Sequence, residues 1–465
     1  MDTLGPLEVG VRRQLRMLAA IAVCACALSW TSLPAARGQS NPAAAPPNIV
    51  LVLVDDVGYG DIGSFGAPDA RTPNIDRLAR EGVKLTDFYA NGANCSPTRT
   101  GFISGRYQQR FGIEVPFGEP NPSGVAGLAP ADTSLPRLLK TKGYSTALVG
   151  KWHLGAQPEF SPNRHGFDEF WGFIGGSHDY YDPADLYHNG EPSTMSGYLT
   201  DEITSHATTF ITAHQREPFF LEVSYNAAHW PFQPPNLAPD KRARPDLLHD
   251  GTRADYVAIL ERADTGVGDI LALLDRLQLA RNTLVVFTSD NGGEWLSHNA
   301  PLFHRKSTLW EGGIRVPALM RWPAQLPAGA VSKQVGITMD LTASFLAAAG
   351  VAPPAAYKPE GINLLPMLKE RRTVERTLFW RIKTAGRDQK AVRRGRWKYI
   401  RDGVGIIDSV HEMVFDLDRD IGERDDQAYR QIPMLVELRK LVADWEASVD
   451  AEKPKPQSQP GPAQP

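Results

Sequence analysis

Cys95, Pro97 and Arg99 lie in the segment Cys-Ser-Pro-Thr-Arg, whose residue types and spacing are suited to anion chemistry. Proline is favoured in the first turn of a helix, so the segment predicts a helix that begins near Cys95. Residues four apart share one helix face, which directs Cys95 and Arg99 the same way. The helix N-terminus adds free N–H groups that would hold a tetrahedral oxyanion beside residue 95. The alternative interpretation is a cysteine buried in a core helix.

Four oxygen-bearing side chains form a second candidate set. They are Asp55, Asp56, Asp290 and Asn291. Carboxylate and amide oxygens suit calcium or magnesium rather than zinc, which prefers nitrogen and sulfur ligands. Asn291 precedes a glycine, and such pairs also mark ordinary turns. Taken together with Asp55 and Asp56, however, the set favours a metal site.

Five basic residues supply the opposite charge: Arg99, Lys151, His153, His229 and Lys306. Fixed cations and a proton donor would lower the barrier for a reaction in which negative charge moves toward a leaving oxygen. A single basic residue is more often a solvated surface group. The local sequence around each residue therefore has to support the functional interpretation.

The elements that would position these residues are apolar runs followed by polar side chains. Such runs, typical of strands buried on both faces, cover residues 48–54, 145–149, 219–223 and 283–288. Helical patterns lie between them at residues 73–81, 134–142 and 254–279. This alternation predicts an α/β fold with a large, mostly parallel sheet flanked by helices. Ligands bind beyond the carboxyl ends of such strands, so the polar sets should converge on one crevice.

The pattern changes after residue 351. A Pro-rich connection leads to short strand-like runs at residues 377–382, 396–400 and 413–417, and a helical pattern covers residues 434–449. We expect a catalytic domain over residues 48–351 and a smaller C-terminal α+β domain with an antiparallel sheet over residues 352–450. Residues 451–465 are rich in Pro and Gln and predict a disordered tail.

The N-terminus predicts export. Arg12, Arg13 and Arg16 precede an apolar run over residues 17–30, and small residues follow, so residues 1–38 are interpreted as a cleaved signal and residues 39–47 as a linker. The run is shorter than the roughly 20 residues of a spanning helix, which argues against a stable membrane span. Arg12-Arg13 leaves Sec and twin-arginine export both open. Cleavage leaves Cys95 as the one cysteine, which must be buried, paired with another chain or chemically altered.

Composition fits an exported enzyme. The 465 residues are 42% hydrophobic and 22% charged, enough for a large core and two unequal domains. The net charge of −3 gives no reason to expect nucleic acid as a partner.

Two segments carry a family resemblance. The stretch from Cys95 to Arg106, Cys-Ser-Pro-Thr-Arg-Thr-Gly-Phe-Ile-Ser-Gly-Arg, resembles the C-x-P-x-R signature of type I sulfatases, and the stretch from Gly143 to His153 resembles a second family motif. Ser104 stands where the family often has threonine. The resemblance runs from about Asn48 to Trp445 and implies an alkaline phosphatase-like fold. It also implies that Cys95 is converted to formylglycine before the protein folds.

The resemblance also implies roles. Residue 95, as hydrated formylglycine, would be the nucleophile, Asp290 would assist its deprotonation, and Ca²⁺, with Mg²⁺ as the alternative, would be held by the oxygen set together with residue 95. Arg99 and Lys151 would stabilise residue 95 and the transferred group. The remaining implied roles are sulfate binding and leaving-group departure for His229 and Lys306, sulfate expulsion for His153, and substrate binding for Ser177 and His178, with Lys151 also contacting the substrate.

Three functions remain open at this point. The first is hydrolysis of a sulfated carbohydrate or aryl sulfate, as in arylsulfatases and N-acetylgalactosamine sulfatases. The second is a phosphatase or phosphodiesterase of the same superfamily, and the third is a non-catalytic protein that binds sulfated glycans with Cys95 unmodified. Besides a sulfated small molecule or glycan, the expected partners are transient: a formylglycine-generating enzyme and the export machinery. Tyr180 and Tyr181 could line the pocket or belong to the core.

Overall fold

The structure is a computed structural model that describes residues 45–119, 121, 123–242, 251–384, 386–402 and 411–454. The chain divides into two compact units, residues 1–45 and 46–465, and the elements described below belong to the second. The predicted signal over residues 1–38, most of the predicted linker and residues 455–465 of the predicted tail lie outside the described residues. Within the described ranges, no helix has both the length and the apolar character needed to cross a membrane.

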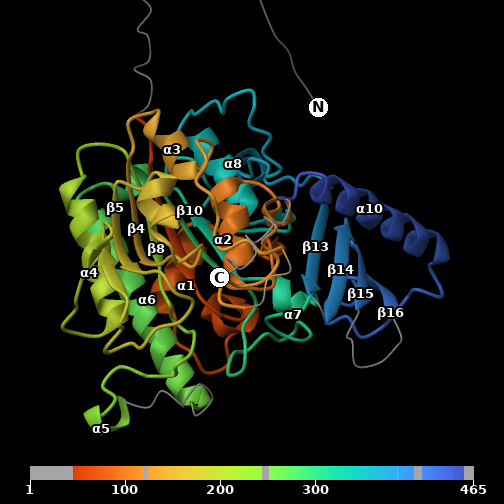
Figure 1. The fold of residues 1–465 in the computed structure, drawn as a ribbon, viewed down its shortest axis with the longest axis horizontal. Helices are drawn as coiled ribbons and strands as arrows, with labels where there is room; N and C mark the ends of the chain where they lie inside the picture. Colours follow the sequence, from red (N-terminus) through yellow and green to blue (C-terminus); the bar gives the residue numbers. More distant parts are fainter. Residues whose placement is uncertain are drawn as a thin grey trace, which may run out of the picture. The chain divides into compact units, whose positions relative to one another are not determined.

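A large sheet forms the centre of this unit (Figure 1). It has ten strands in the order β11-β2-β10-β9-β1-β8-β4-β5-β6-β7. Its five middle strands run parallel: β9 (Thr283–Ser289), β1 (Asn48–Val54), β8 (Phe219–Ser224), β4 (Ser145–Lys151) and β5 (Glu169–Phe173). The outer strands are β10 (Ala318–Arg321), β2 (Val83–Leu85), β11 (Ala330–Ser332), β6 (Leu186–His188) and β7 (Glu191–Pro192). All residues of β1 are buried, as expected for a strand covered on both faces.

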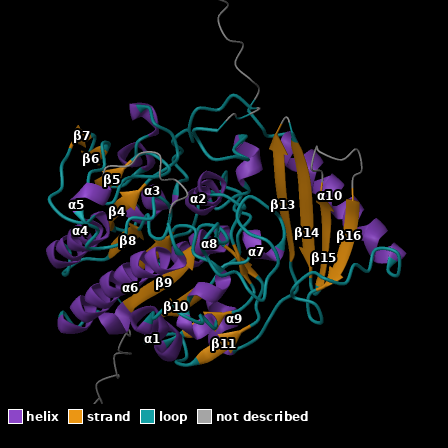
Figure 2. Ribbon diagram, turned by 90° about the horizontal axis from the view of Figure 1, so that it is seen from below, coloured by secondary structure: helices purple, strands orange, loops and turns teal. Residues whose placement is uncertain are grey.

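Helices cover both faces of the large sheet (Figures 1 and 2). One face packs Val50, Val52 and Val54 of β1 against α1 (Pro73–Glu81), α4 (Leu199–Ala213) and α6 (Arg253–Arg276). The other face packs Ile49 and Leu51 against α2 (Cys95–Ser104), α3 (Leu135–Lys140) and α8 (Met339–Ala348). Successive residues of a strand point to opposite faces, so one continuous apolar run supplies both cores.

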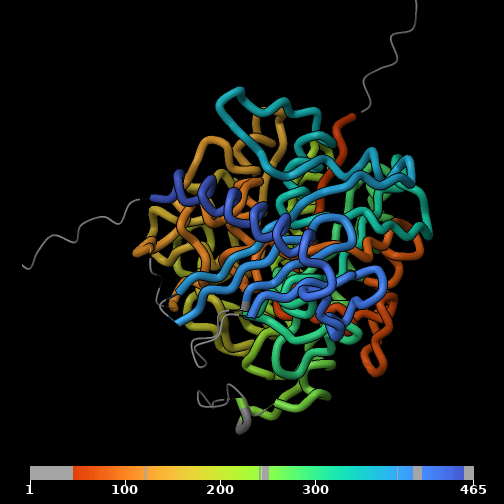
Figure 3. Tube along the Cα trace, turned by 90° about the vertical axis from the view of Figure 1, so that its right-hand side faces the viewer, coloured from red at the N-terminus to blue at the C-terminus, as the bar shows by residue number. Residues whose placement is uncertain are grey.

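A second, four-stranded sheet is antiparallel throughout. It contains β13 (Thr377–Thr384), β14 (Arg387–Arg394), β15 (Trp397–Asp402) and β16 (His411–Asp416), and α10 (Ile432–Asp450) packs along it (Figures 2 and 3). Its core includes Trp380 and Tyr399, and it also includes Tyr89 and Ile314 from the larger sheet region. The remaining short elements are β3 (Phe88–Tyr89) paired with β12 (Gly336–Ile337), α5 (Pro239–Arg242), α7 (Glu311–Ile314) and α9 (Leu365–Glu370).

The predicted fold class is confirmed: a large, mostly parallel sheet flanked by helices, with a smaller antiparallel sheet toward the C-terminus. The runs predicted at residues 48–54 and 73–81 are β1 and α1 with the same bounds. Two details differ. The run predicted at residues 145–149 continues through Lys151, so this lysine is the last residue of β4. The strand β14 was not predicted, because its sequence Arg-Asp-Gln-Lys-Ala-Val-Arg-Arg lacks an apolar run.

Candidate functional site

The predicted site residues follow four neighbouring parallel strands. Asp55 and Asp56 come directly after β1, Asp290 and Asn291 after β9, Lys151 ends β4, and His229 follows β8. Because β9, β1, β8 and β4 are adjacent and parallel, their carboxyl ends meet at one edge of the sheet. Backbone hydrogen bonds hold the segments together, since Asp55 N donates to Ala227 O at 2.9 Å and Asp290 N to Val54 O at 3.1 Å.

Each of three buried aspartates is paired with one cation. Lys151 Nζ contacts Asp55 Oδ2, Lys306 Nζ lies 2.7 Å from Asp56 Oδ2, and Arg99 Nη2 lies 2.9 Å from Asp290 Oδ2. Burial alone would raise the pKa of Asp55 and Asp56, but Lys151 and Lys306 respectively hold each below its usual value. Asp290 differs, because burial and the nearby Asp55 carboxylate raise its pKa despite Arg99.

The oxygen atoms at this edge fit a divalent cation. Asn291 Nδ2 donates to Asp56 Oδ1 at 2.7 Å, while Asn291 Oδ1 and Asp290 Oδ1 are buried without a hydrogen-bond partner in the described part of the chain. Asp55, Asp56, Cys95 and His229 each offer a ligand atom within 4.8 Å of one another. Buried polar atoms are normally satisfied, so these two orphaned oxygens fit the ligand set of a cation. Carboxylate and amide oxygens are the ligands that calcium and magnesium prefer.

Cys95 is the first residue of α2, as predicted, and Asn94 is its N-cap residue. The thiol Sγ donates to Asp55 Oδ1 at 3.5 Å, and residues 95–103 of the helix are all buried. Burial, reinforced by the Asp55 carboxylate, raises the pKa of the Cys95 thiol far above its usual value. The unmodified thiol is therefore neutral, and a neutral thiol is a weak nucleophile.

Arg99 lies one turn after Cys95 and points into the same site. Its Nε donates to Asp290 Oδ2 at 3.0 Å, and its Nη1 donates to Lys151 O at 3.0 Å and to Ser224 Oγ at 2.6 Å. These contacts reach three different strand ends. The arginine therefore fixes the relative positions of the strand ends as well as supplying charge.

The two histidines occupy different surroundings. His229 Nε2 lies 3.5 Å from Asp56 Oδ2, and Nδ1 lies 2.6 Å from Trp230 O. His153 Nε2 lies 3.0 Å from Phe117 O, and its buried Nδ1 has no hydrogen-bond partner among the described residues. Burial lowers the pKa of His229, and burial together with Lys151 lowers that of His153 further. Both rings are neutral near pH 7 in this state.

The loop after β5 carries Ser177 and His178. A Cβ atom added to Gly176 would lie 2.5 Å from the His153 ring, so this glycine allows the loop to approach the site closely. The His178 ring packs edge-on against Phe173 at 4.5 Å, and its Nε2 is buried without a hydrogen-bond partner in the described chain. Burial lowers the pKa of His178 to about 4.

Direct contacts join nine of the twelve predicted residues. They are Asp55, Asp56, Cys95, Arg99, Lys151, His229, Asp290, Asn291 and Lys306. His153 is two residues beyond Lys151, and the loop with Ser177 and His178 lies against the His153 ring. In the described part of the chain, no hydrogen bond joins Ser177 to any of these nine residues. Tyr180 is fully buried, and its hydroxyl lies 3.0 Å from His229 O, so it supports the backbone rather than lining a pocket.

Sequence reasoning missed four residues that contact or adjoin this set. Ser224 ends β8 and binds Arg99, which the rule of polar residues at strand ends could have found. Asn94 Nδ2 donates to Ser307 Oγ at 2.7 Å, and Glu294 Oε2 lies 3.5 Å from Lys306 Nζ, but neither contact has a local sequence signal. Glu222 is buried in the middle of β8, where burial raises its pKa to about 7 against the influence of Arg99.

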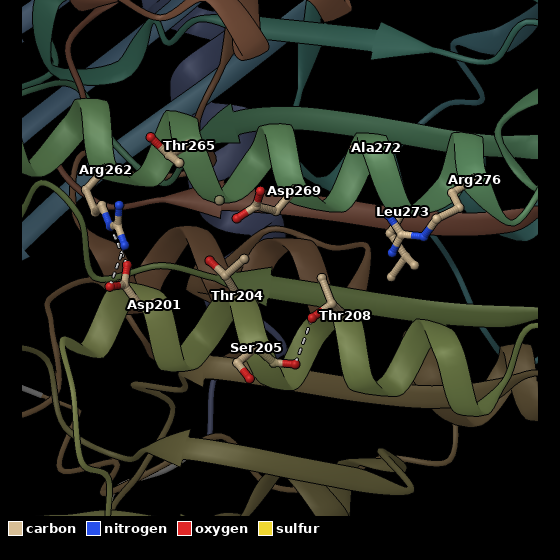
Figure 4. A pocket seen from close by; sticks show the side chains of 11 residues that line it. Asp201, Thr204, Ser205, Thr208, Arg262, Thr265, Asp269, Ala272, Leu273 and Arg276 are labelled. Carbon is tan, nitrogen blue, oxygen red and sulfur yellow. Dashed lines mark hydrogen bonds and ion pairs between the residues drawn. The ribbon is translucent and has the colours of Figure 1, made fainter.

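A separate groove lies between α4 and α6 (Figure 4). Its walls carry hydroxyl groups such as those of Thr204 and Thr208, and Asp201 and Arg262 form an ion pair at one end. None of the predicted site residues lines this groove.

Comparisons with known proteins agree with the geometry. A family profile described as Sulfatase matches residues 47–351, and one described as "N-sulphoglucosamine sulphohydrolase, C-terminal" matches residues 301–441. N-acetylgalactosamine-6-sulfatase of Sus scrofa is 34% identical, with 91% of this chain and 90% of the relative covered. Arylsulfatase A of Bos taurus is 32% identical, with 90% and 92% covered.

A solved structure, Ps i-CgsB in complex with k-i-k-neocarrahexaose, is 30% identical with a TM-score of 0.77. The match covers 86% of this chain and 92% of that one. The predicted resemblance is thus confirmed along most of the sequence and in three dimensions. The chain therefore belongs to the sulfatase family and is a sulfuric ester hydrolase.

Proposed function

We propose that this protein is an exported, formylglycine-dependent sulfatase that uses Ca²⁺ and acts on a sulfated carbohydrate. The observation that carries the proposal is the buried cluster at the start of α2, where the Cys95 side chain meets Asp55 beside two further aspartates and three cations. Such a cluster can hold an anionic group and a divalent cation together.

The two groups that the family adds to this site have distinct tasks. Formylglycine derived from Cys95 would supply a hydrated aldehyde as the nucleophile toward sulfur. Asp55, Asp56, Asp290 and Asn291 would hold Ca²⁺, with residue 95 as a further ligand, and the ion would supply positive charge for the sulfate group. The orphaned oxygens of Asp290 and Asn291 support this ligand set, and Mg²⁺ remains the alternative ion.

The residues around the nucleophile control its proton and its position. Asp290 accepts the proton of the attacking oxygen, and Arg99, which binds Asp290, keeps that carboxylate aligned. Lys151 extends from the end of β4 to stabilise residue 95 and the transferred group. His153, whose Nδ1 has no hydrogen bond to a described residue, takes the proton that is released when sulfate leaves.

The leaving-group side of the site is formed by His229 and Lys306. Both contact Asp56 and both are held in buried positions, so they can bind the sulfate ester and stabilise the departing oxygen. Ser177 and His178 lie in the loop against His153 and contact the rest of the substrate. Their assignment rests on the family resemblance and on the close approach of Gly176.

A carbohydrate substrate is favoured by the relatives. One of them is named N-acetylgalactosamine-6-sulfatase and one solved structure is a complex with k-i-k-neocarrahexaose, whereas arylsulfatase A represents the aryl alternative. A panel of sulfated monosaccharides, glycans and aryl sulfates would separate the two classes. Turnover of phosphate esters and none of the sulfate esters would instead favour the phosphatase alternative.

Residue 95 itself is tested by a mass spectrum of the peptide from Leu85 to Arg99, taken from protein made in its native host without thiol-modifying reagents. We expect formylglycine, which contains no sulfur. An unmodified cysteine in all molecules would favour the binding-protein alternative. The N-terminal residue of the same exported protein reports whether residues 1–38 are removed.

The metal is tested by chelation. Treatment with EGTA should abolish turnover and lower the melting temperature, because three buried aspartates then lose a shared positive charge. Added Ca²⁺ should restore both properties. Unchanged turnover and melting temperature after complete removal of bound metal would contradict the proposed cofactor.

A further inference from the structure

Arg387 connects the second sheet to the catalytic site. It is the first residue of β14, and its Nη2 donates to Ser307 O at 2.6 Å. Ser307 directly follows Lys306, and its Oγ accepts a hydrogen bond from Asn94, the residue before Cys95. The guanidinium is therefore separated from the nucleophile position by only the Ser307 and Asn94 contacts.

Arg387 differs from the other arginines of the small sheet in having no ion pair with a described residue. Each other arginine in the four strands has a carboxylate partner: Arg381 with Glu114, Arg393 with Asp87, Arg394 with Glu375, and Arg401 with Asp388. Among the described residues, no carboxylate lies within ion-pair distance of Arg387. Its neighbour Asp388 points to Arg401 and Lys390 instead. The hydrogen bond to a neutral carbonyl fixes Arg387 in place, and in the described part of the chain its positive charge has no carboxylate partner.

We propose that Arg387 binds a second anionic group of the substrate, either a carboxylate or another sulfate, so that the preferred substrate is a polyanionic glycan. The guanidinium carries five N–H donors in a plane, and one of them holds Ser307. The remaining donors match the two oxygens of a carboxylate or sulfate. This inference rests on the proposed function, because it takes Lys306 and residue 95 as the position of the scissile sulfate.

The test measures binding rather than turnover. The protein is the full-length Cys95→Ala variant, which cannot form formylglycine, and binding is measured by calorimetric titration. Three ligands are compared: 6-O-sulfated disaccharides that contain a uronate, the methyl esters of these uronates, and disaccharides that carry a second sulfate in place of the uronate. We expect the dianionic members to bind at least tenfold more tightly than the methyl esters, as hydrogen bonds between charged groups allow. A preference for the uronate over the second sulfate, or the reverse, identifies which anion is bound.

Variants then assign the preference to Arg387. Arg387→Gln keeps an N–H donor for Ser307 but removes the charge, so it should lose the tenfold preference while binding the methyl esters as before. Arg387→Lys keeps the positive charge and should retain part of the preference for dianionic ligands. Lys383→Gln removes a cation from β13 that faces Asp450, and it should retain all of the preference.

Three results would overturn the proposal. They are equal binding of dianions and methyl esters by the parent protein, an intact preference in Arg387→Gln, and an equal loss for all ligands in Arg387→Gln, which would make the arginine a support for the Ser307 loop. Hydrolysis by the unmodified protein is measured separately on the same disaccharides. Its absence would count against the proposed function without altering the binding result.

Discussion

The two oxygens of Asp290 have very different surroundings. Oδ2 accepts from Arg99, whereas Oδ1 is buried with no hydrogen-bond partner in the described chain. This asymmetry suits the two roles proposed for Asp290. Arg99 holds Oδ2 in place, which leaves Oδ1 for the metal or for the proton.

Asp290→Asn should therefore lower kcat by a factor of roughly 10² to 10⁴, the usual contribution of a positioned general base. The measurement is steady-state turnover of the best sulfate ester, with a melting curve to show that the variant is folded. Asp269→Asn, on the exposed side of α6, is the matched control and should be unchanged. Retention of more than a tenth of the parental turnover would remove Asp290 from the proposed role.

The ionisation of Glu222 should make the stability of the folded chain depend on pH. Burial raises its pKa from 4.5 to about 7 in the folded chain, with Arg99 acting in the opposite direction. The folded state thus holds this proton more tightly than the unfolded state. The stability contributed by Glu222 is complete below pH 4.5 and is lost as the pH rises through 7.

Glu222→Gln should accordingly be more stable than the parent at pH 8, by on the order of 3 kcal/mol, and the difference should shrink toward pH 5. Denaturant unfolding at several pH values measures this. The exposed Glu159→Gln serves as the control for the same change at a surface position. A Glu222→Gln difference that stays constant from pH 5 to 8 would contradict the raised pKa.

At the scale of elements, a buried charge cluster joins β15 to α7. Lys398 Nζ lies 2.8 Å from Glu311 Oε1 and 2.8 Å from Glu423 Oε1, and Glu311 Oε2 also contacts Arg315. Burial alone would raise the pKa of Glu311, but Lys398 and Arg315 lower it to about 2. Glu423 Oε2 accepts from Glu311 N at 2.6 Å. Since α7 follows the loop with Lys306, this cluster helps to hold that loop.

Lys398→Met should lower the free energy of unfolding by about 3–5 kcal/mol, because it leaves two buried carboxylates without their common cation. Chemical denaturation gives the value directly. Lys440→Met removes an exposed i,i+4 pair on α10 and should cost less than about 0.5 kcal/mol. Similar losses in the two variants would mean that the buried cluster adds nothing beyond an ordinary surface pair.

The sequence was most informative for elements whose pattern is local. The apolar runs predicted β1 and β9 and their polar ends, because a strand buried on both faces must be apolar throughout. The sequence was uninformative for β14, because Arg393 and Lys390 of this strand pair with Asp87 and Glu446, which lie far away in the chain. The contacts of Asn94 and Arg387 with Ser307 were equally invisible, since each joins residues far apart in the chain.

At the scale of the whole molecule, the two sheets share one core. Tyr89 and Ile314 from the large sheet region belong to the same apolar cluster as Trp380 and Tyr399 from the small sheet. The proposed boundary near residue 351 therefore separates two sequence regions whose apolar surfaces cover each other.

A chain that ends at residue 351 should consequently fail to fold as a soluble unit, because it would expose the apolar side of that cluster to water. Expression of residues 39–351 beside residues 39–465, followed by gel filtration, makes the comparison. A monodisperse, cooperatively melting 39–351 fragment would show that the large sheet needs no cover from the small one.

The burial of α2 also limits the time during which Cys95 of the newly made chain is accessible to another protein. Cys95 is 2% exposed, so an enzyme that modifies it must arrive before the sheet closes. Closure around Arg99 needs Asp290, which is 191 residues further along the chain. At about 5–20 residues per second, ribosomes take roughly 10–40 s to cover that distance. The long-range order of the strands would thus give the proposed formylglycine-generating enzyme tens of seconds of access to a residue that the finished fold buries.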